Sequence, residues 1–133
     1  MGILKGLAYA ALLAIVALVV LGVSVVLESF SLAGALRGII CQRLVPRADG
    51  EGRCVAMEVC VNTGRIAEAI SDPDKTSTIN GLINDGAYYG MQTFDQHLVS
   101  LIRDGVITLD AAMSASTNPH DLTVELRRLG LVA

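Results

Sequence analysis

The sequence is poor in aromatic and basic side chains. It has no Trp, and aromatic residues make up only 4% of its 133 residues. Ten Lys and Arg residues stand against thirteen Asp and Glu residues, which gives a net charge of -3 at pH 7. Proteins that bind nucleic acid usually carry clustered basic residues, and those that bind single strands add aromatic side chains for stacking. We therefore expect no nucleic-acid partner.

Cysteine and histidine are also scarce. The thiols of Cys41, Cys54 and Cys60 show no C-x-x-C spacing. On one extended strand, Cys54 and Cys60 would lie about 20 Å apart at ~3.3 Å per residue, too far for a disulfide. Free thiols in a reducing cytoplasm are the expected state. Because His97 and His120 form no i, i+4 pair with a second ligand, the sequence predicts no helical zinc site.

A phosphate-binding loop is missing as well. Such a loop has the pattern G-x-x-x-x-G-K-[ST], in which backbone N–H groups surround the phosphates and the Lys neutralises their charge. The lysines here are Lys5 and Lys75. Thr76 follows Lys75, but Asp74 and Ala69 occupy the two glycine positions. The sequence therefore predicts no bound cofactor and offers no catalytic residues.

What the chain does contain is a long apolar run near its N-terminus. Gly6 to Leu27 carries no charged side chain and is bounded by Lys5 and Glu28. As a helix it would span about 33 Å at ~1.5 Å per residue, which matches a hydrocarbon core of ~30 Å. We expect residues 1–28 to form a transmembrane anchor. A signal peptide is the alternative, with a weak cleavage pattern at Ser31-Leu32-Ala33.

The basic residues that flank this run predict its orientation. Arg37, Arg43 and Arg47 follow it, whereas Lys5 and the terminal amine precede it. The positive-inside rule favours the more basic side as the cytoplasmic one. We therefore expect a single-pass protein of the inner (cytoplasmic) membrane, with its C-terminal part in the cytoplasm.

The first part of the remaining chain, residues 29–133, combines a helical pattern with a strand pattern. Apolar residues recur at helical spacing from Ser31 to Leu44, which predicts a helix. The turn signal at Asp49 to Gly52 precedes Arg53 to Val61, a β-branched run that predicts a strand. A short strand from Arg43 to Arg47 can pair with it as a hairpin.

Alternation along the predicted strand separates two faces. We expect the larger side chains to form the core face, and the other side chains to form the opposite face. The expected core residues are Val55, Met57, Val59 and Val61, and the opposite residues are Cys54, Ala56, Glu58 and Cys60.

Residues 62–130 read as a helical region, after a strand region at residues 43–61. Five short helices are expected there. The first is capped by Asn62 or Thr63, the second ends near Asp85-Gly86, and the third covers Met91 to Ile102. Thr108 caps the fourth, and Asn118-Pro119 begins the last.

Four segments of the chain resemble one family. They read GAYYGMQTFDQHL from Gly86 to Leu98, SLAGALRGIICQRLVP from Ser31 to Pro46, RADGEGRCVAMEVCVNT from Arg47 to Thr63, and TNPHD from Thr117 to Asp121. Together and in this order, they resemble the C-terminal part of the PilT-type secretion ATPases, the motors of type IV pilus retraction and twitching motility.

This resemblance implies a fold and a set of partners. It implies an α+β chain in which the N-terminal transmembrane helix is followed by a partial RecA-like C-terminal segment, with a short β-hairpin and a cluster of short helices. Intact members bind ATP and Mg, couple ATP hydrolysis to pilus retraction and act as hexamers. The nucleotide-binding segments are missing here, so the family is an ATPase but no autonomous hydrolysis is expected of this chain.

The resemblance also implies a coupling motif, with a role in linking nucleotide state to motion. The motif comprises Ala69, Ile70, Asp72, Lys75 and Thr76. Ser71 stands where the family carries an arginine, which puts any role of that charge in doubt. The residues themselves permit a simpler interpretation, a helix stop followed by a new helix cap.

Possible subunit contacts form a second set. Gln42 and Arg43 belong to a Q-R-L segment found across secretion and pilus motors, and residues near Thr93 can project from a helix. The expected contacts are Gln42, Arg43, Gln92, Asp95 and Gln96. A solvated polar face is the alternative for each of them.

Two functional interpretations remain open at this stage. In the first, the chain is a truncated PilT-like fragment that serves as an interaction or regulatory module for intact pilus motor hexamers or pilus-assembly proteins, at the membrane. In the second, it is a non-functional product of a truncated or rearranged reading frame, with a structural membrane-anchored helical domain.

Overall fold

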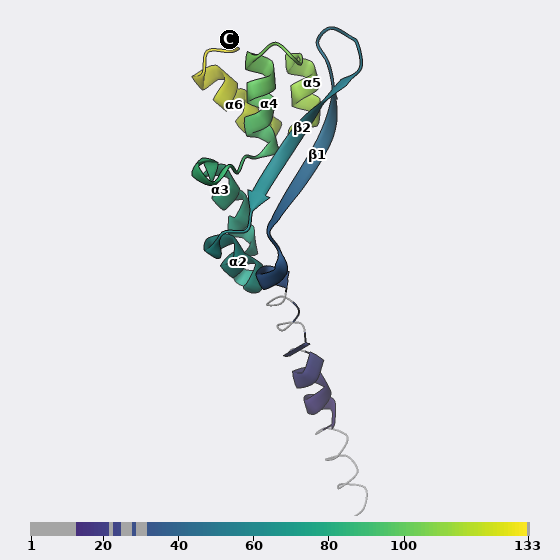
Figure 1. Ribbon diagram of the computed structural model, residues 1–133, viewed down its shortest axis with the longest axis vertical. Coiled ribbons are helices and arrows are strands. Elements are labelled where there is room, and N and C mark those ends of the chain that lie inside the picture. Colours follow the sequence, from purple (N-terminus) through teal and green to yellow (C-terminus); the bar gives the residue numbers. More distant parts are fainter. Residues whose placement is uncertain (1–12, 22, 25–27, 29–31, 133) are drawn as a thin grey trace, which may run out of the picture.

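The computed structural model describes residues 13–21, 23–24, 28 and 32–132. In the main body a long β-hairpin lies beside a series of short helices (Figure 1). The helices α4, α5 and α6 gather at the end of the hairpin that carries its turn, and α2 and α3 lie at the opposite end. The hairpin therefore runs the length of the body.

Strand β1 (Gly38–Pro46) pairs with β2 (Arg53–Val61) in an antiparallel, two-stranded sheet, in which Gln42 lies opposite Met57. Gly50 and Gly52 supply positive φ angles of 77° and 78° in the connecting turn, a conformation that glycine adopts without steric cost. The predicted hairpin is thus present, and its first strand is longer than expected.

The helix predicted from Ser31 to Leu44 is wrong. Only residues 32–35 are helical in the described part of this segment, and the strand begins at Gly38. The apolar spacing fits a helix, but β-branched Ile39 and Ile40 also suit a strand. Pairing along the whole of β2 decides between them, because tertiary context overrides local propensity.

The predicted core face of β2 is also wrong. Ala56 and Cys60 are buried, with exposed fractions of 0% and 6%, whereas Val55 is 38% exposed. Helix α4 packs against β2. Small side chains on the strand let a helix approach the sheet closely, so we attribute the choice of face to Ala56 and Cys60 rather than to the larger valines.

The expected N-terminal transmembrane helix is not supported. Residues 13–21 are helical and apolar, but the remainder of the run from Gly6 to Leu27 lies partly outside the described residues. Among the residues that the structure describes, no helix has the length and apolar character that a membrane span needs. The cellular location of the protein stays a prediction.

Short helices follow the hairpin. They are α2 (Gly64–Ser71), the 3₁₀ helix η1 (Pro73–Thr78), α3 (Ile79–Asn84), the 3₁₀ helix η2 (Ala87–Tyr89), α4 (Phe94–Arg103), α5 (Leu109–Ala115) and α6 (Pro119–Arg128). The predicted caps at Thr63, Thr108 and Asn118 are confirmed, since each side chain accepts a backbone hydrogen bond at its helix start. The third predicted helix begins later than expected, at Phe94 rather than Met91.

Two clusters of buried side chains hold these elements together. Cluster A joins the turn end of the hairpin to α4, α5 and α6, and it comprises Val45, Ala56, Phe94, Leu98, Val99, Ile107, Ala112, Leu122 and Leu126. Cluster B joins the other end of β2 to α2 and α3, and it comprises Cys60, Ile66, Ile83 and Met91. Strand β2 contributes to both, so it is the element that connects the two halves of the core.

Candidate functional site

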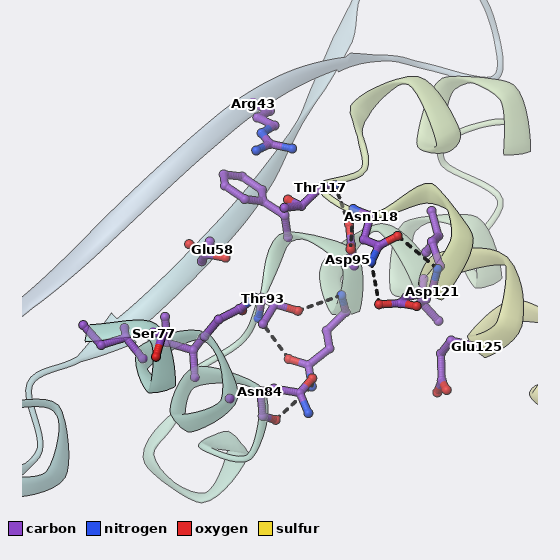
Figure 2. Close-up of a pocket in the computed structure, with 18 of the residues that line it drawn as sticks. Arg43, Glu58, Ser77, Asn84, Thr93, Asp95, Thr117, Asn118, Asp121 and Glu125 are labelled. Atoms are coloured by element: carbon purple, nitrogen blue, oxygen red, sulfur yellow. Dashed lines mark hydrogen bonds between the residues drawn. The ribbon is translucent and has the colours of Figure 1, made fainter. Parts of the chain in front are cut away.

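An open groove of ≈ 1100 Å³ lies between η1 and α3 on one side and α4 and α6 on the other (Figure 2). Apolar side chains contribute to its lining: Ile79, Ile83, Phe94, Val99 and Leu122. Four acidic residues and two basic residues complete its charged lining: Glu58, Asp95, Asp121, Glu125, Arg43 and Arg128. The groove is therefore partly apolar and carries more acidic than basic groups.

Asp95, at the first turn of α4, binds the segment between α5 and α6. Its carboxylate accepts hydrogen bonds from the Ser116 hydroxyl at 2.9 Å, from the Thr117 N–H at 3.0 Å and from the Asn118 N–H at 3.3 Å. Asn118 in turn donates from its side chain to Asp121 at 2.6 Å. This carboxylate thus binds the start of the T-N-P-H-D segment to α4.

Gln96 and Gln92 are likewise engaged within the chain. Gln96 forms a capping box with Thr93, and its side-chain amide also donates to the Asn84 carbonyl at 3.0 Å. The backbone of Gln92 exchanges hydrogen bonds of 2.9 and 3.1 Å with Val59, along the outer edge of β2. These bonds join α4 and its leading segment to α3 and to the hairpin.

Arg43 and Gln42 lie on opposite faces of β1. The Arg43 guanidinium stacks over the Phe94 ring at 4.0 Å from its centroid and donates to the Ala115 carbonyl at 2.5 Å. An arginine in this position combines a cation–π contact with a hydrogen bond to the end of α5. Gln42 is exposed on the other face. Arg43 is thus engaged within the chain and Gln42 is not, and a role of either one in subunit contact stays a prediction.

On α6, an ion pair contributes to the lining of the groove. Arg128 donates to both carboxylate oxygens of Glu125, at 2.8 and 2.6 Å. These hydrogen bonds lower the pKa of Glu125 below its usual range. Both side chains are exposed, so water screens the pair and its effect on stability is small.

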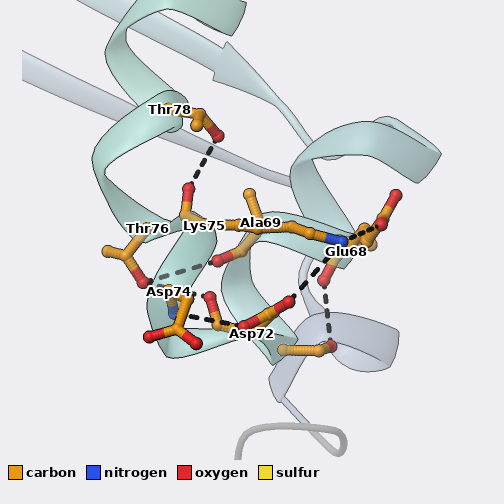
Figure 3. A network of polar contacts seen from close by, with 9 residues as sticks. Glu68, Ala69, Asp72, Asp74, Lys75, Thr76 and Thr78 are labelled. Atoms are coloured by element: carbon orange, nitrogen blue, oxygen red, sulfur yellow. Dashed lines mark hydrogen bonds and ion pairs between the residues drawn. The ribbon is translucent and has the colours of Figure 1, made fainter.

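The predicted coupling motif spans the end of α2 and the start of η1 (Figure 3). The Asp72 N–H donates to the backbone carbonyl of Glu68 at the end of α2, and the Asp72 carboxylate accepts from the Asp74 N–H at 3.1 Å. Pro73 follows at the first position of η1. One residue thus ends one helix and caps the next, as the simpler interpretation predicts.

Lys75 is held by carboxylates on the surface. Its Nζ pairs with Glu68 and lies 3.5 Å from the Asp72 carboxylate. The hydrogen bond to Glu68 raises the pKa of Lys75, and the neighbouring negative charges add to this effect. Thr76 lies 3.5 Å from the carbonyls of Ala69 and Asp72. Ala69 is buried, and Ile70 packs against cluster B. The motif is therefore a compact corner, and its coupling role stays a prediction.

Two structural roles were missed from the sequence. The His97 imidazole accepts a hydrogen bond from the Met57 N–H at 2.9 Å on β2. The Asn62 side chain donates to the carbonyls of Ala33 at 2.7 Å and Leu36 at 2.8 Å. Both contacts join residues that are far apart in sequence, so no local sequence pattern predicts them.

The described residues offer limited chemistry. They contain no group of three or more His, Cys, Asp or Glu side chains that could hold a metal ion. Burial raises the pKa of the Cys60 thiol, and the nearby Glu58 carboxylate raises it further. Cys60 is therefore a poor nucleophile, because the thiolate is the reactive form.

Comparisons with known proteins identify relatives for about two thirds of the chain. It is 35% identical over 92 residues to a type IV pilus ATPase, PilU of Pseudomonas aeruginosa, and 33% identical over 92 residues to a twitching motility protein of Neisseria gonorrhoeae. PilT of P. aeruginosa is 31% identical over 90 residues. These matches cover 68–69% of this chain and 24–26% of the relatives. No family model matches the sequence.

Solved structures agree with these matches. The pilus retraction motor PilT, determined with bound ADP, matches 70% of this chain with a TM-score of 0.59 and 34% identity, over 25% of its own length. The ATPase DotB of Legionella pneumophila matches 66% of this chain with a TM-score of 0.54 and 21% identity, which shows a shared fold alone. The chain therefore spans about a quarter of the proteins it matches.

Proposed function

Because about two thirds of this chain is homologous to a segment of the PilT-type pilus ATPases, we propose that it acts in type IV pilus retraction as an interaction module. The module corresponds to the C-terminal part of such a motor and docks on intact motor hexamers or on pilus-assembly proteins. In this proposal it modulates the motor and does not hydrolyse ATP itself.

One combination of observations carries this proposal. The matched segment keeps the fold of PilT at 34% identity, yet its sequence contains no phosphate-binding loop. In the described part of the chain, Lys75 contacts the carboxylates of Glu68 and Asp72. Acidic side chains therefore already balance the charge of this lysine. These observations support binding to other proteins, rather than ATP hydrolysis, as the activity of the segment.

The test uses the full chain and a purified PilT-type hexamer. We expect the chain to bind the hexamer and to change its ATPase rate, while the chain alone shows no hydrolysis and binds ATP-Mg no better than millimolar in calorimetry. Lys75→Ala should weaken the effect on the hexamer if the corner at α2 and η1 has a coupling role. Arg103→Ala is the matched control, since Arg103 is an exposed cation elsewhere.

Two results would contradict the proposal. A micromolar ATP dissociation constant that Lys75→Ala abolishes would mean that the chain has a nucleotide site of its own. Absence of both binding and rate change, with hexamers and assembly proteins alike, would favour the alternative of a product with no independent activity.

A further inference from the structure

The outer edge of β1 is unprotected. On β2, Val59 bonds to Gln92 and the Met57 N–H bonds to His97, so the odd-numbered residues of this strand turn their backbone groups away from β1. In an antiparallel pair, alternate residues bond to the neighbouring strand. With the observed register, the backbone groups of Ile40, Gln42 and Leu44 therefore face outward. The structure gives them no backbone partner among the described residues.

Features that normally block such an edge are weak here. Proteins protect edge strands with charged side chains, bulges or an interior proline. Arg43 is the only charged residue of β1, and it lies inward over Phe94. Pro46 stands at the very end of the strand. The apolar side chains of Ile40 and Leu44 are 70% and 59% exposed beside this edge.

The sequence of the edge is self-complementary. If a second β1 pairs with it in antiparallel orientation about a twofold axis at Gln42, Ile40 lies opposite Leu44 of the second copy, and Leu44 lies opposite Ile40. Each of these pairs, and the pair of Gln42 residues, would exchange both backbone hydrogen bonds. No charged side chain faces a like charge on this outer face of β1.

A groove beside the edge fits the same arrangement. It has a volume of ≈ 410 Å³ and lies between residues Arg43–Pro46 and the small side chains Ala111, Ser114 and Ala115 of α5. In the twofold register, Ile39 of the second copy lies opposite Val45, on the face of the sheet that carries α5. Ile39 is 45% exposed in the single chain, and pairing would bring it beside the apolar part of this groove, whose lining also includes Asp110.

From these observations we infer that β1 is a self-association edge, at which two copies of this chain pair through antiparallel β1 strands centred on Gln42. On the outer face of the resulting four-stranded sheet, the apolar pairs of Ile40 and Leu44 lie on either side of the central pair of Gln42 residues. The contact is one pair of nine-residue strands, about 30 Å long at ~3.3 Å per residue. Such a contact buries less than the roughly 1,200 Å² of a stable interface, so the association is weak and concentration-dependent.

Hydrogen exchange of the full chain tests this inference directly. The amides of Ile40, Gln42 and Leu44 should gain protection as the concentration rises, up to roughly millimolar. Over the same range, a dimer should appear in sedimentation velocity or native mass spectrometry. Constant rapid exchange of these amides at all concentrations would overturn the proposal.

Charge variants at the twofold axis make the test specific. Gln42→Lys places two ammonium groups opposite each other and should weaken the dimer by about tenfold or more. Gln42→Glu should weaken it likewise, whereas an equimolar mixture of the two variants should form heterodimers. Val124→Lys is the matched control, because Val124 is exposed on α6 and lies outside the proposed contact.

Two outcomes of the variant test are decisive. A dimer that Gln42→Lys does not weaken associates through another surface, which overturns the proposal. Failure of the two charge variants to combine would exclude pairing centred on Gln42. Circular dichroism of each variant establishes that its fold is retained, which is expected because Gln42 is exposed.

Discussion

At the scale of single residues, several polar side chains join elements that are distant in sequence. Asp95 connects α4 to the segment before α6, Arg43 connects β1 to α4 and α5, and His97 connects α4 to β2. Hydrogen bonds to a charged group contribute about 1.5–3 kcal/mol each in favourable cases. Of the residues suspected of contacting other subunits, Arg43, Gln92, Asp95 and Gln96 are thus also internal connectors, whereas Gln42 is exposed.

The prediction at this scale concerns Asp95. Asp95→Ala removes the acceptor of three hydrogen bonds and should lower the free energy of unfolding by about 2–3 kcal/mol. Asp95→Asn keeps one acceptor oxygen and should cost less. Urea unfolding measures both, and Glu51→Ala in the exposed hairpin turn is the control. Equal stability of Asp95→Ala and the parent chain would mean that the loop before α6 does not depend on this carboxylate.

At the scale of elements, backbone space decides the junction between α3 and η2. A Cβ on Gly86 would meet the Leu82 carbonyl oxygen at 2.9 Å and the side chain of Met91, whereas a Cβ on Gly81 would meet nothing within 4 Å. Both glycines lie in the same short segment, but only Gly86 is required by the close approach of neighbouring atoms. Comparing substitutions at the two positions therefore distinguishes the effect of steric crowding from the effect on the entropy of the unfolded chain.

Substitution by alanine at these two glycines should give opposite results. Gly86→Ala should destabilise the fold by about 1–3 kcal/mol, because Met91 belongs to cluster B and has to move. Gly81→Ala, within α3, should stabilise it by up to about 1 kcal/mol. Thermal unfolding of the two variants checks both signs. Similar melting temperatures for the pair would contradict the packing at Gly86.

Local signals predicted the helical elements well and the sheet less well. The caps at Thr63, Thr108 and Asn118 depend on bonds within one turn, so the sequence near them contains the necessary information. The strand from Gly38 was mistaken for a helix because its pairing with β2 is not local. The same limit applies to the candidate sites, since the contacts of Asp95 and Arg43 join residues whose proximity only the fold creates.

At the scale of the whole molecule, the core is divided. Cluster A and cluster B lie toward opposite ends of the hairpin, and β2 is common to both. Sub-global opening occurs where few buried contacts hold a unit to the rest. The α2–α3 end, with its smaller cluster, should therefore open before the end that contains α4, α5 and α6.

Cavities in the two clusters test this division. Ile66 in cluster B and Leu126 in cluster A are 1% and 0% exposed, and replacement by Ala should cost about 2–5 kcal/mol at each site. In native-state hydrogen exchange, Ile66→Ala should speed exchange in α2 and α3 and leave α4–α6 nearly unchanged, whereas Leu126→Ala should affect mainly α4–α6. Uniform acceleration throughout by Ile66→Ala would indicate a single cooperative unit.

The Asn62 contact has a mechanical consequence. The chain enters β1 and leaves β2 at the same end of the hairpin, and there the Asn62 side chain and backbone donate to the carbonyls of Ala33, Leu36 and Arg37. A pulling force applied before Leu32 would reach the strand pair at this open end, in the direction that separates the strands one bond at a time. The hydrogen bonds of Asn62 would bear that load first. This one residue therefore sets how much tension the hairpin withstands before its strands begin to separate.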